Sequence, residues 1–179
     1  MSLIILKIHN FKYVCLKHIL NILHKGFQNG NLALMDITKT NEYICILENA
    51  HSQQINSIAF NKSNTLIASS GDDKTTNIYS IKTYWQNQKK THLTPSKMKP
   101  IIQIDVHRCE VTALAWSPTA ENVLVIAEKK LFSLYDVETK DFTASVKIRA
   151  EISAIVWSSK YNVLFYKFFE VRTRLGISF

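Results

Sequence analysis

The sequence is poor in the residues that build several kinds of functional site. It has only four glycines, three prolines and three cysteines among 179 residues. Phosphate-binding loops and dinucleotide fingerprints need closely spaced glycines, and none of these motifs is present. Cys15, Cys45 and Cys109 are an odd number without a close pair, and the six histidines form no ligand motif with them. Neither a disulfide framework nor a metal site is therefore indicated, and no cofactor is expected.

Long apolar runs are also missing. The first 27 residues, MSLIILKIHNFKYVCLKHILNILHKGF, are apolar overall, but Lys7, Lys12 and Lys17 interrupt every run before it reaches membrane-spanning length. A signal peptide keeps its charge at the start, whereas these charges are spread along the segment. We expect neither secretion nor a membrane partner, and the unpaired cysteines suit a cytoplasmic or nuclear protein.

What the sequence does have is enough apolar material for a folded domain. Hydrophobic residues make up 46% and charged residues 20%, and 179 residues is a common length for one domain. The stretch from His51 to Ser80 reads as three short strands. Ile55–Phe60 alternates, Leu66–Ala68 is apolar, and Thr75–Ile81 alternates again after the turn Ser70–Lys74. This order predicts an antiparallel meander.

The parts of that meander return elsewhere in the chain. The segment INSIAFN, which begins at Ile55, is matched by VTALAWS from Val111 and by ISAIVWS from Ile152, and an apolar run follows each copy. The third strand recurs around Met35, Tyr79 and Tyr135, with the segments NLALMDI, TNIYSI and FSLYDV. One meander is too small to bury two faces, so stacked copies are expected.

A period of about 40 to 45 residues with four strands each is that of the WD-repeat propeller, and the chain resembles this family. Asp36 and Asp136 end their third strands as the Asp of the family's Trp-Asp pair does. In the best copy, around Tyr79 at the Trp position, the matching residues are His51, Ser69 or Ser70, and the turn residue Asp73.

The resemblance implies that these side chains form a hydrogen-bonded brace inside the blade. We therefore interpret His51, Ser69, Ser70, Asp73 and Tyr79 as structural. A His-Ser-Asp trio could also suggest a hydrolase, but the nucleophile turn G-x-S-x-G is missing. His107 repeats the position of His51. Counting back from Tyr135, however, Lys129 falls at the turn Asp and Val125 or Ile126 at the strand Ser, so the third blade is not expected to form the full brace.

The fold class expected is all-β, a propeller of four-stranded antiparallel blades with about 3 to 4 blades, incomplete or open. The blades are expected at about 1–50, 51–107, 108–149 and 150–179, the last one incomplete. The family usually has about seven blades, so we favour part of a larger propeller over an open one. An open ring would leave blade edges at which another chain can pair.

The ends of the chain are the hardest to interpret. If Asn29-Gly30 is a hairpin turn, Ile19–Phe27 holds one strand and Asn31–Ile37 the next. The alternative is an amphipathic helix, because Leu16, Ile19, Leu20 and Leu23 can share one face. Strands are favoured. Beyond Tyr166 the resemblance stops.

A basic insertion, residues 82–100, lengthens the second repeat. It contains lysines and no acidic residue. One interpretation is a solvated loop. The other is a contact for an acidic partner or nucleic acid, in which aromatic rings stack and lysines neutralise phosphate. The residues with this candidate role are Trp85, Lys89, Lys90, His92, Lys97 and Lys99.

The function predicted is that of a protein-interaction scaffold or a subunit of a multiprotein complex, without catalysis. Its partners would be other proteins or peptides, and the candidate contact loops are Asn49–Gln54, Ser70–Lys74 and His107–Glu110. The phosphoinositide motif of some propellers, Phe-Arg-Arg-Gly, is absent, which argues against a lipid partner. A nucleic-acid-associated subunit that uses the basic insertion is the alternative.

Overall fold

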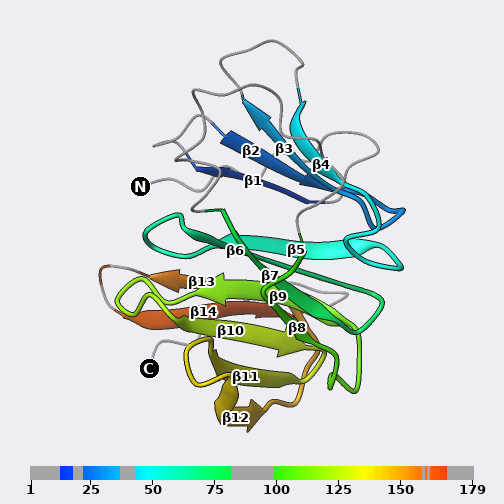
Figure 1. The fold of residues 1–179 in the computed structure, drawn as a ribbon. Helices are drawn as coiled ribbons and strands as arrows, with labels where there is room; N and C mark the ends of the chain where they lie inside the picture. The colour runs from blue at the N-terminus through cyan, green and yellow to red at the C-terminus, as the bar shows by residue number, and fades with distance from the viewer. Residues whose placement is uncertain are drawn as a thin grey trace.

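The computed structural model describes residues 13–17, 22–36, 43–81, 99–158, 160 and 162–168. These residues contain fourteen strands and no helix, so the all-β prediction is confirmed (Figure 1). The strands are β1 (Tyr13–Lys17), β2 (Ile22–Gly26), β3 (Leu32–Asp36), β4 (Tyr43–Leu47), β5 (Ile55–Phe60), β6 (Leu66–Gly71), β7 (Thr76–Ser80), β8 (Ile102–Ile104), β9 (Val111–Trp116), β10 (Val123–Glu128), β11 (Leu131–Asp136), β12 (Asp141–Lys147), β13 (Ile152–Ser158) and β14 (Val163–Phe168).

The strands form three four-stranded meanders and one strand pair. The sheets have the orders β1-β2-β3-β4, β5-β6-β7-β8 and β9-β10-β11-β12, and β13 pairs with β14. All pairings are antiparallel, as short polar turns between alternating segments predict. We call these sheets the first, second, third and fourth blades.

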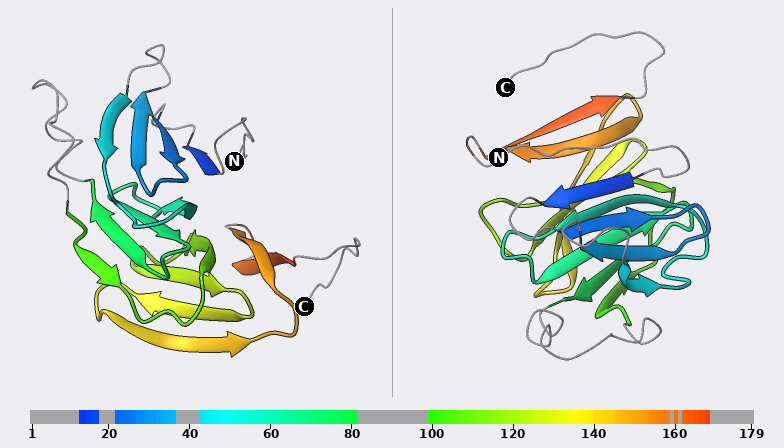
Figure 2. Two further views of the ribbon diagram at one scale, coloured as in Figure 1. Left: turned by 90° about the vertical axis from the view of Figure 1, so that its right-hand side faces the viewer. Right: turned by 90° about the horizontal axis from the view of Figure 1, so that it is seen from above.

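The blades are stacked around a common axis, with their first strands innermost. β5 packs beside β9, and β9 beside β13. In Figure 2, left, the blades follow an arc, with the first blade and the β13–β14 pair at its two ends. The structure is therefore a partial propeller, as the repeats predicted.

Apolar layers between the blades form the core. Leu34, Ile55 and Tyr79 belong to the layer between the first and second blades. Val111, Leu124 and Tyr135 belong to the layer between the second and third blades. A further layer joins the third and fourth blades and includes the buried Val125, Phe132 and Ile155. Because strand side chains alternate, the second and third blades each contribute one face to each of two layers. Burial of each large apolar side chain contributes roughly 1.5–3 kcal/mol.

Polar bonds join the inner strands of the second and third blades. The Ser57 hydroxyl accepts a hydrogen bond from the Leu114 N–H at 3.0 Å. The indole N–H of Trp116 donates to the Ala59 carbonyl, also at 3.0 Å. Buried polar groups without partners are costly, so these bonds favour one register between β5 and β9.

The first blade settles the alternative left open by the sequence. Its residues 13–17 and 22–26 are β1 and β2, so the prediction of strands is confirmed and the amphipathic helix is wrong. Gly30 has a φ of 81°, and a Cβ there would collide with the carbonyl oxygen of His51. The same close approach lets the His51 N–H donate to the Gly30 carbonyl at 2.9 Å, which joins the first two blades. A residue with a side chain would not fit this turn.

Candidate functional site

A buried polar cluster, the His51 brace, joins the loop before β5 to the turn between β6 and β7. It consists of His51, Ser69, Asp73 and Thr75. Nδ1 of His51 lies 3.0 and 3.1 Å from the two carboxyl oxygens of Asp73. Nε2 lies 2.8 Å from the Ser69 hydroxyl. A carboxylate only accepts hydrogen bonds, so Nδ1 carries the hydrogen that faces Asp73.

The Asp73 carboxylate accepts hydrogen bonds from several other donors besides His51. Thr75 donates to it through its hydroxyl at 2.9 Å and its backbone N–H at 3.1 Å, and the Ser52 N–H donates at 3.0 Å. Burial alone would raise the pKa of Asp73, but the hydrogen bond and charge of His51, with the donors from Thr75 and Ser52, lower it overall. The carboxylate is thus stabilised in its charged form.

Tyr79 lies beside this cluster at the position where the family resemblance expects Trp. Its ring is buried in the first apolar layer and is only 2% exposed. Burial raises the pKa of Tyr79 to about 12, and the nearby charge of Asp73 acts in the same direction. Hydrogen bonds with Asn77 and Ser69 oppose this rise. The phenol therefore stays neutral and contributes packing.

The structure distinguishes the two candidate serines. Ser69 bonds His51, whereas the Ser70 hydroxyl is buried and has no hydrogen-bond partner among the described residues. Adjacent residues of a strand face opposite sides of a sheet. Ser69 shares the side of Ile67, toward the first blade, and Ser70 shares that of Ala68, toward the third. The assignment of Ser70 to the brace is corrected accordingly.

The His51 brace has the composition of a hydrolytic triad but not its accessibility. Ser69 is 0% exposed and His51 is 3% exposed. A nucleophile must reach a substrate carbonyl, and the Ser69 hydroxyl is buried against its neighbours. The arrangement holds a loop against a turn.

A second cluster, the His107 brace, lies between the second and third blades. It consists of His107, Glu128 and Thr76. Nδ1 of His107 lies 2.9 Å from the Glu128 carboxylate, and Nε2 lies 3.0 Å from the Thr76 hydroxyl. Burial would raise the pKa of Glu128, but the hydrogen bond and charge of His107 and the N–H groups of Arg108 and Cys109 lower it overall.

The His107 brace differs from what the repeat count predicted. No serine is present at the strand position, as expected, yet the histidine is fully bonded. Eight positions separate Ser69 from its partner Asn77, whereas seven separate Ile126 from its partner Ser133. The turn of the third blade is therefore one residue shorter, but Glu128 is not a turn residue. It lies at the end of β10, at the position that Gly71 has in β6, because Glu128 pairs with Val111 as Gly71 pairs with Ile55. A glutamate is longer than an aspartate and reaches His107 from the end of β10.

Sequence reasoning missed three residues of the braces. Thr75 carried a usable signal, because an aspartate side chain in a turn commonly bonds the backbone N–H two residues further on, as Asp73 does with Thr75. Thr76 carried none, since the equivalent position in the first blade is Leu32. Glu128 was missed because the count looked for an acid in the turn, whereas Glu128 lies at the end of the preceding strand, at the position of Gly71.

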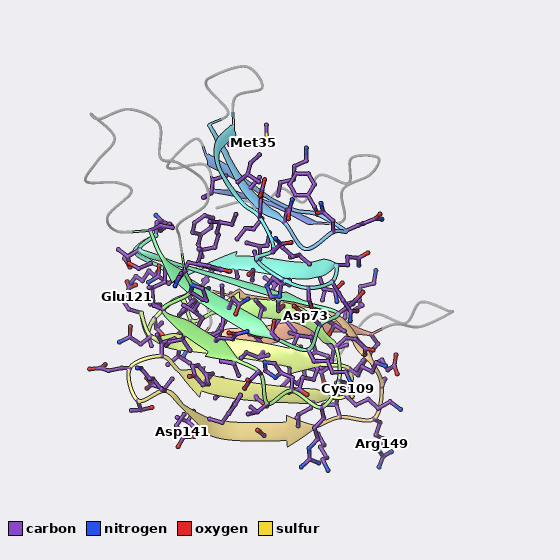
Figure 3. The ribbon with its side chains drawn as sticks, turned by 45° about the vertical axis from the view of Figure 1, so that its right-hand side comes forward. Met35, Asp73, Cys109, Glu121, Asp141 and Arg149 are labelled. Atoms are coloured by element: carbon purple, nitrogen blue, oxygen red, sulfur yellow. The ribbon has the colours of Figure 1, made fainter. Side chains whose placement is uncertain are left out.

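The braces bring three candidate contact loops to one side of the molecule, which we call the loop face: Asn49–Gln54, Ser70–Lys74 and His107–Glu110. The Asp72 N–H donates to the Gln54 carbonyl at 2.9 Å. The hydrogen bond from the Lys129 ammonium, which lies 3.0 Å from Glu110, lowers the pKa of Glu110, and the charge of Lys74 lowers it slightly further. Figure 3 places Asp73, Cys109 and Arg149 along this side, and Glu121 and Asp141 on the other.

The candidate residues of the basic insertion lie mostly outside the described part of the chain. Trp85, Lys89, Lys90, His92 and Lys97 belong to this undescribed segment. Lys99 is described and exposed. Within the described residues, no three or more His, Cys, Asp or Glu side chains are grouped so that they could hold a metal ion. The same part of the chain has no helix suited to crossing a membrane.

Two family models match the chain. The model described as "WD domain, G-beta repeat" matches residues 42–80, which include β4 to β7. The model described as "Anaphase-promoting complex subunit 4 WD40 domain" matches residues 83–160. Together these matches extend over the second and third blades and β13.

Three relatives share sequence with parts of the chain. The chain is 23% identical over 160 residues to the APC/C activator protein CDH1 of Saccharomyces cerevisiae, which covers 87% of this chain and 25% of that protein. It is 25% identical over 146 residues to the Anaphase-promoting complex subunit cdc20 of Dictyostelium discoideum, and the match covers 80% of this chain and 27% of that protein. Protein HIR2 of Debaryomyces hansenii is 35% identical over 79 residues, and this match covers 42% of this chain and 8% of that protein.

A solved structure shares the fold. A chain in the "Crystal Structure of Mitotic Checkpoint Complex" matches with a TM-score of 0.67 and 19% identity, over 83% of this chain and 42% of that chain. This chain thus spans about a quarter of CDH1 and cdc20. The blades described above correspond to only part of each relative.

Proposed function

Because this chain belongs to the WD-repeat family of β-propellers, we propose that it is a non-catalytic interaction scaffold, a subunit of a multiprotein complex that binds proteins or peptides through its loop face. The observation that carries the proposal is the loop face itself. Its loops are held by buried, fully bonded braces, so their exposed side chains are presented on a rigid support. Rigid presentation lowers the entropy cost of binding.

The exposed residues of the loop face have the chemistry of a protein contact. Ser52, Gln53, Lys74 and Arg108 are exposed. The histidines and acids beneath them are buried and bonded to one another, so they stabilise the loops. Contact with a partner is therefore made by the exposed side chains. Arginine is enriched at the energetic centres of protein interfaces, which makes Arg108 the leading contact candidate.

The partner class follows from the relatives. Two of them carry names that place them with the anaphase-promoting complex, as an activator and as a subunit. We propose an assembly of this kind as the setting of this chain, in the cytoplasm or nucleus. The nucleic-acid alternative gains nothing from the described residues, since Lys99 is the one residue of its predicted contact set that they include.

Sedimentation of the tagged full chain from its own cells tests the proposal. We expect it to migrate well above its mass of 20.6 kDa. The double variant Lys74→Glu with Arg108→Glu should release it from the complex. The matched control is Lys62→Glu, an exposed lysine in the turn between β5 and β6, at the other end of these strands.

Each outcome is decisive for one part of the proposal. Antibodies to anaphase-promoting complex subunits identify the assembly in the heavy fractions. Migration at the monomer mass, or release by the control variant alone, would overturn the role of the loop face. Collapse of the heavy fractions after nuclease treatment, with steep weakening by salt, would favour the nucleic-acid alternative.

A further inference from the structure

The connection between β8 and β9, residues 105–110, crosses the loop face from the outermost strand of the second blade to the innermost strand of the third. His107 fixes its middle between two turns, because Nδ1 bonds Glu128 at the end of β10 and Nε2 bonds Thr76 at the start of β7. The Arg108 N–H also donates to Glu128, at 3.1 Å. Arg108 therefore lies between the β6–β7 turn of the second blade and the β10–β11 turn of the third.

Each of these three segments carries an exposed cation. Lys74 belongs to the β6–β7 turn, Arg108 to the crossing connection and Lys130 to the β10–β11 turn. We call the place where they meet, residues 71–75, 105–110, 129 and 130, the seam, and all of its residues are described. None of the three cations forms an ion pair with a described residue. Their charges are therefore available to a partner.

The acids closest to the seam are engaged by other groups. The Lys129 ammonium lies 3.0 Å from the Glu110 carboxylate. The Asn56 amide donates to the Asp72 carboxylate. The charge of Glu151 acts on Lys129, whose pKa is raised first by the hydrogen bond and charge of Glu110 and then by Glu151. The exposed part of the seam therefore keeps an excess of positive charge.

Glu110 shows which anion suits this place. This carboxylate of the chain itself is bonded by Lys129 of the third blade, and the charge of Lys74 of the second blade also lowers its pKa. Cations from two blades thus act on one carboxylate. A partner carboxylate further out along the connection would meet Arg108, with Lys74 on one side and Lys130 on the other. Charge-assisted hydrogen bonds of this kind are stronger than neutral ones.

Val106 adds an apolar contact on the outer side of Arg108. It is 69% exposed, and it lies nearer to the rim because the connection starts at β8. Asp105 beside it is also exposed and would repel another acid. The acidic residues of a partner should therefore lie toward the axis of the propeller, and an apolar residue should lie toward the rim.

We propose that the seam binds a short segment of a partner protein in which neighbouring acidic residues stand beside an apolar residue. The carboxylates bind Lys74, Arg108 and Lys130, and the apolar side chain covers Val106. The inference rests on the proposed function, because it names the partner chemistry of the loop face. A nucleic acid is a poorer fit, since its regular row of phosphates would also meet the exposed Asp105.

Labelled peptides test the proposal with the full chain. Each contains three consecutive glutamates and one leucine within glycines and serines, and two versions, with the leucine before or after the glutamates, cover both chain directions. Fluorescence anisotropy at low salt measures binding. We expect glutamine in place of every glutamate to weaken the better version about tenfold, and serine in place of leucine about threefold. Added salt should weaken binding because it screens exposed charges.

Variants at the turns locate the site without a loss of stability. Lys74 has a φ of 59°, in the left-handed region, which asparagine tolerates better than lysine. Lys74→Asn should weaken peptide binding about threefold and leave the urea midpoint unchanged or higher, and Arg108→Gln should weaken binding about tenfold. The matched control is Lys140→Asn, since Lys140 has the same φ of 59° and lies in the β11–β12 turn, at the opposite end of the third blade. It should leave binding unchanged.

Charge reversal separates this inference from the proposed function. Lys74→Glu with Arg108→Glu should lose the glutamate peptides and bind peptides that carry lysine in place of glutamate. If this variant leaves the heavy fractions but the unaltered chain does not bind the glutamate peptides, the inference is overturned and the proposed function stands. If the unaltered chain binds the peptides but migrates as a monomer, the inference stands and the proposed function is overturned.

Two further results would overturn the inference. Equal binding of the glutamine and glutamate peptides would exclude recognition by charge. Binding of a labelled single strand of uridine nucleotides that Lys74→Asn weakens, without binding of the glutamate peptides, would assign the seam to nucleic acid.

Discussion

Nε2 of His107 in the third blade lies 3.0 Å from the hydroxyl of Thr76 in the second, so a brace that would otherwise stay within one blade joins two. In the second blade the equivalent nitrogen of His51 bonds Ser69 of its own blade. The third blade has Ile126 at that position, which cannot form the bond. Thr76 supplies the missing hydroxyl from the neighbouring sheet.

The bond between Thr76 and His107 should contribute to stability across the blade interface. We expect Thr76→Val, which keeps the shape and removes the hydroxyl, to lower the free energy of unfolding by about 1 to 2 kcal/mol. A double-mutant cycle with His107→Phe, followed by urea unfolding, should give a coupling energy above about 0.5 kcal/mol. Additive effects of the two substitutions would contradict the cross-blade bond.

The two adjacent serines of β6 should respond differently to the same substitution. Ser69→Ala leaves Nε2 of the buried His51 without its partner, and should cost about 1 to 3 kcal/mol of unfolding free energy. Ser70→Ala removes a buried hydroxyl that has no partner among the described residues, so it should be neutral or stabilising. Chemical denaturation of the two variants makes the comparison, and equal losses would disprove the assignment of Ser69.

Acid should unfold the chain partly through its two braced carboxylates. The folded-state pKa values of Asp73 and Glu128 are lowered from 3.8 and 4.5, so the folded state binds protons less readily than the unfolded state. The stability that these two carboxylates contribute is fully present above their ordinary pKa values. It is lost as the pH falls through their lower folded-state pKa values.

Urea midpoints between pH 6 and pH 2.5 measure this effect. The variants Asp73→Asn and Glu128→Gln should be less stable at pH 6 and should lose less stability on acidification than the unaltered chain. Glu48→Gln, at an exposed glutamate, is the control and should keep the original pH profile. Parallel profiles for all four proteins would exclude the braces as the acid-sensitive element.

Tyr79 should make the fold sensitive to alkali. Its pKa is raised from 10.0 to about 12. Its contribution to the free energy of unfolding is therefore complete below pH 10 and is lost as the pH rises toward 12. Tyr79→Phe should be less stable by about 1 kcal/mol at pH 8, because the phenol's hydrogen bonds are lost. The difference in urea midpoint between the two proteins should shrink by pH 11.5. A constant difference would mean that Tyr79 ionises equally in both states.

Much of the fold could be predicted because the signals that specify it are local. The alternation in Ile55–Phe60 and in its copies at Val111 and Ile152 indicates strands, and the spacing of the copies indicates stacked blades. His51 and Asp73 could be placed together because the second blade keeps the family's spacing.

The tertiary structure alone decided which faces meet. Alternation separates Ser69 from Ser70 but does not say which of them points toward His51, since that depends on which neighbouring blade packs on each side of β6. The pairing of His107 with Glu128 and Thr76 depends on an acid at the end of β10 and on contact with another blade. The exposure of Val146 depends on how many strands of the next blade cover β12, and no local pattern of residues carries that information.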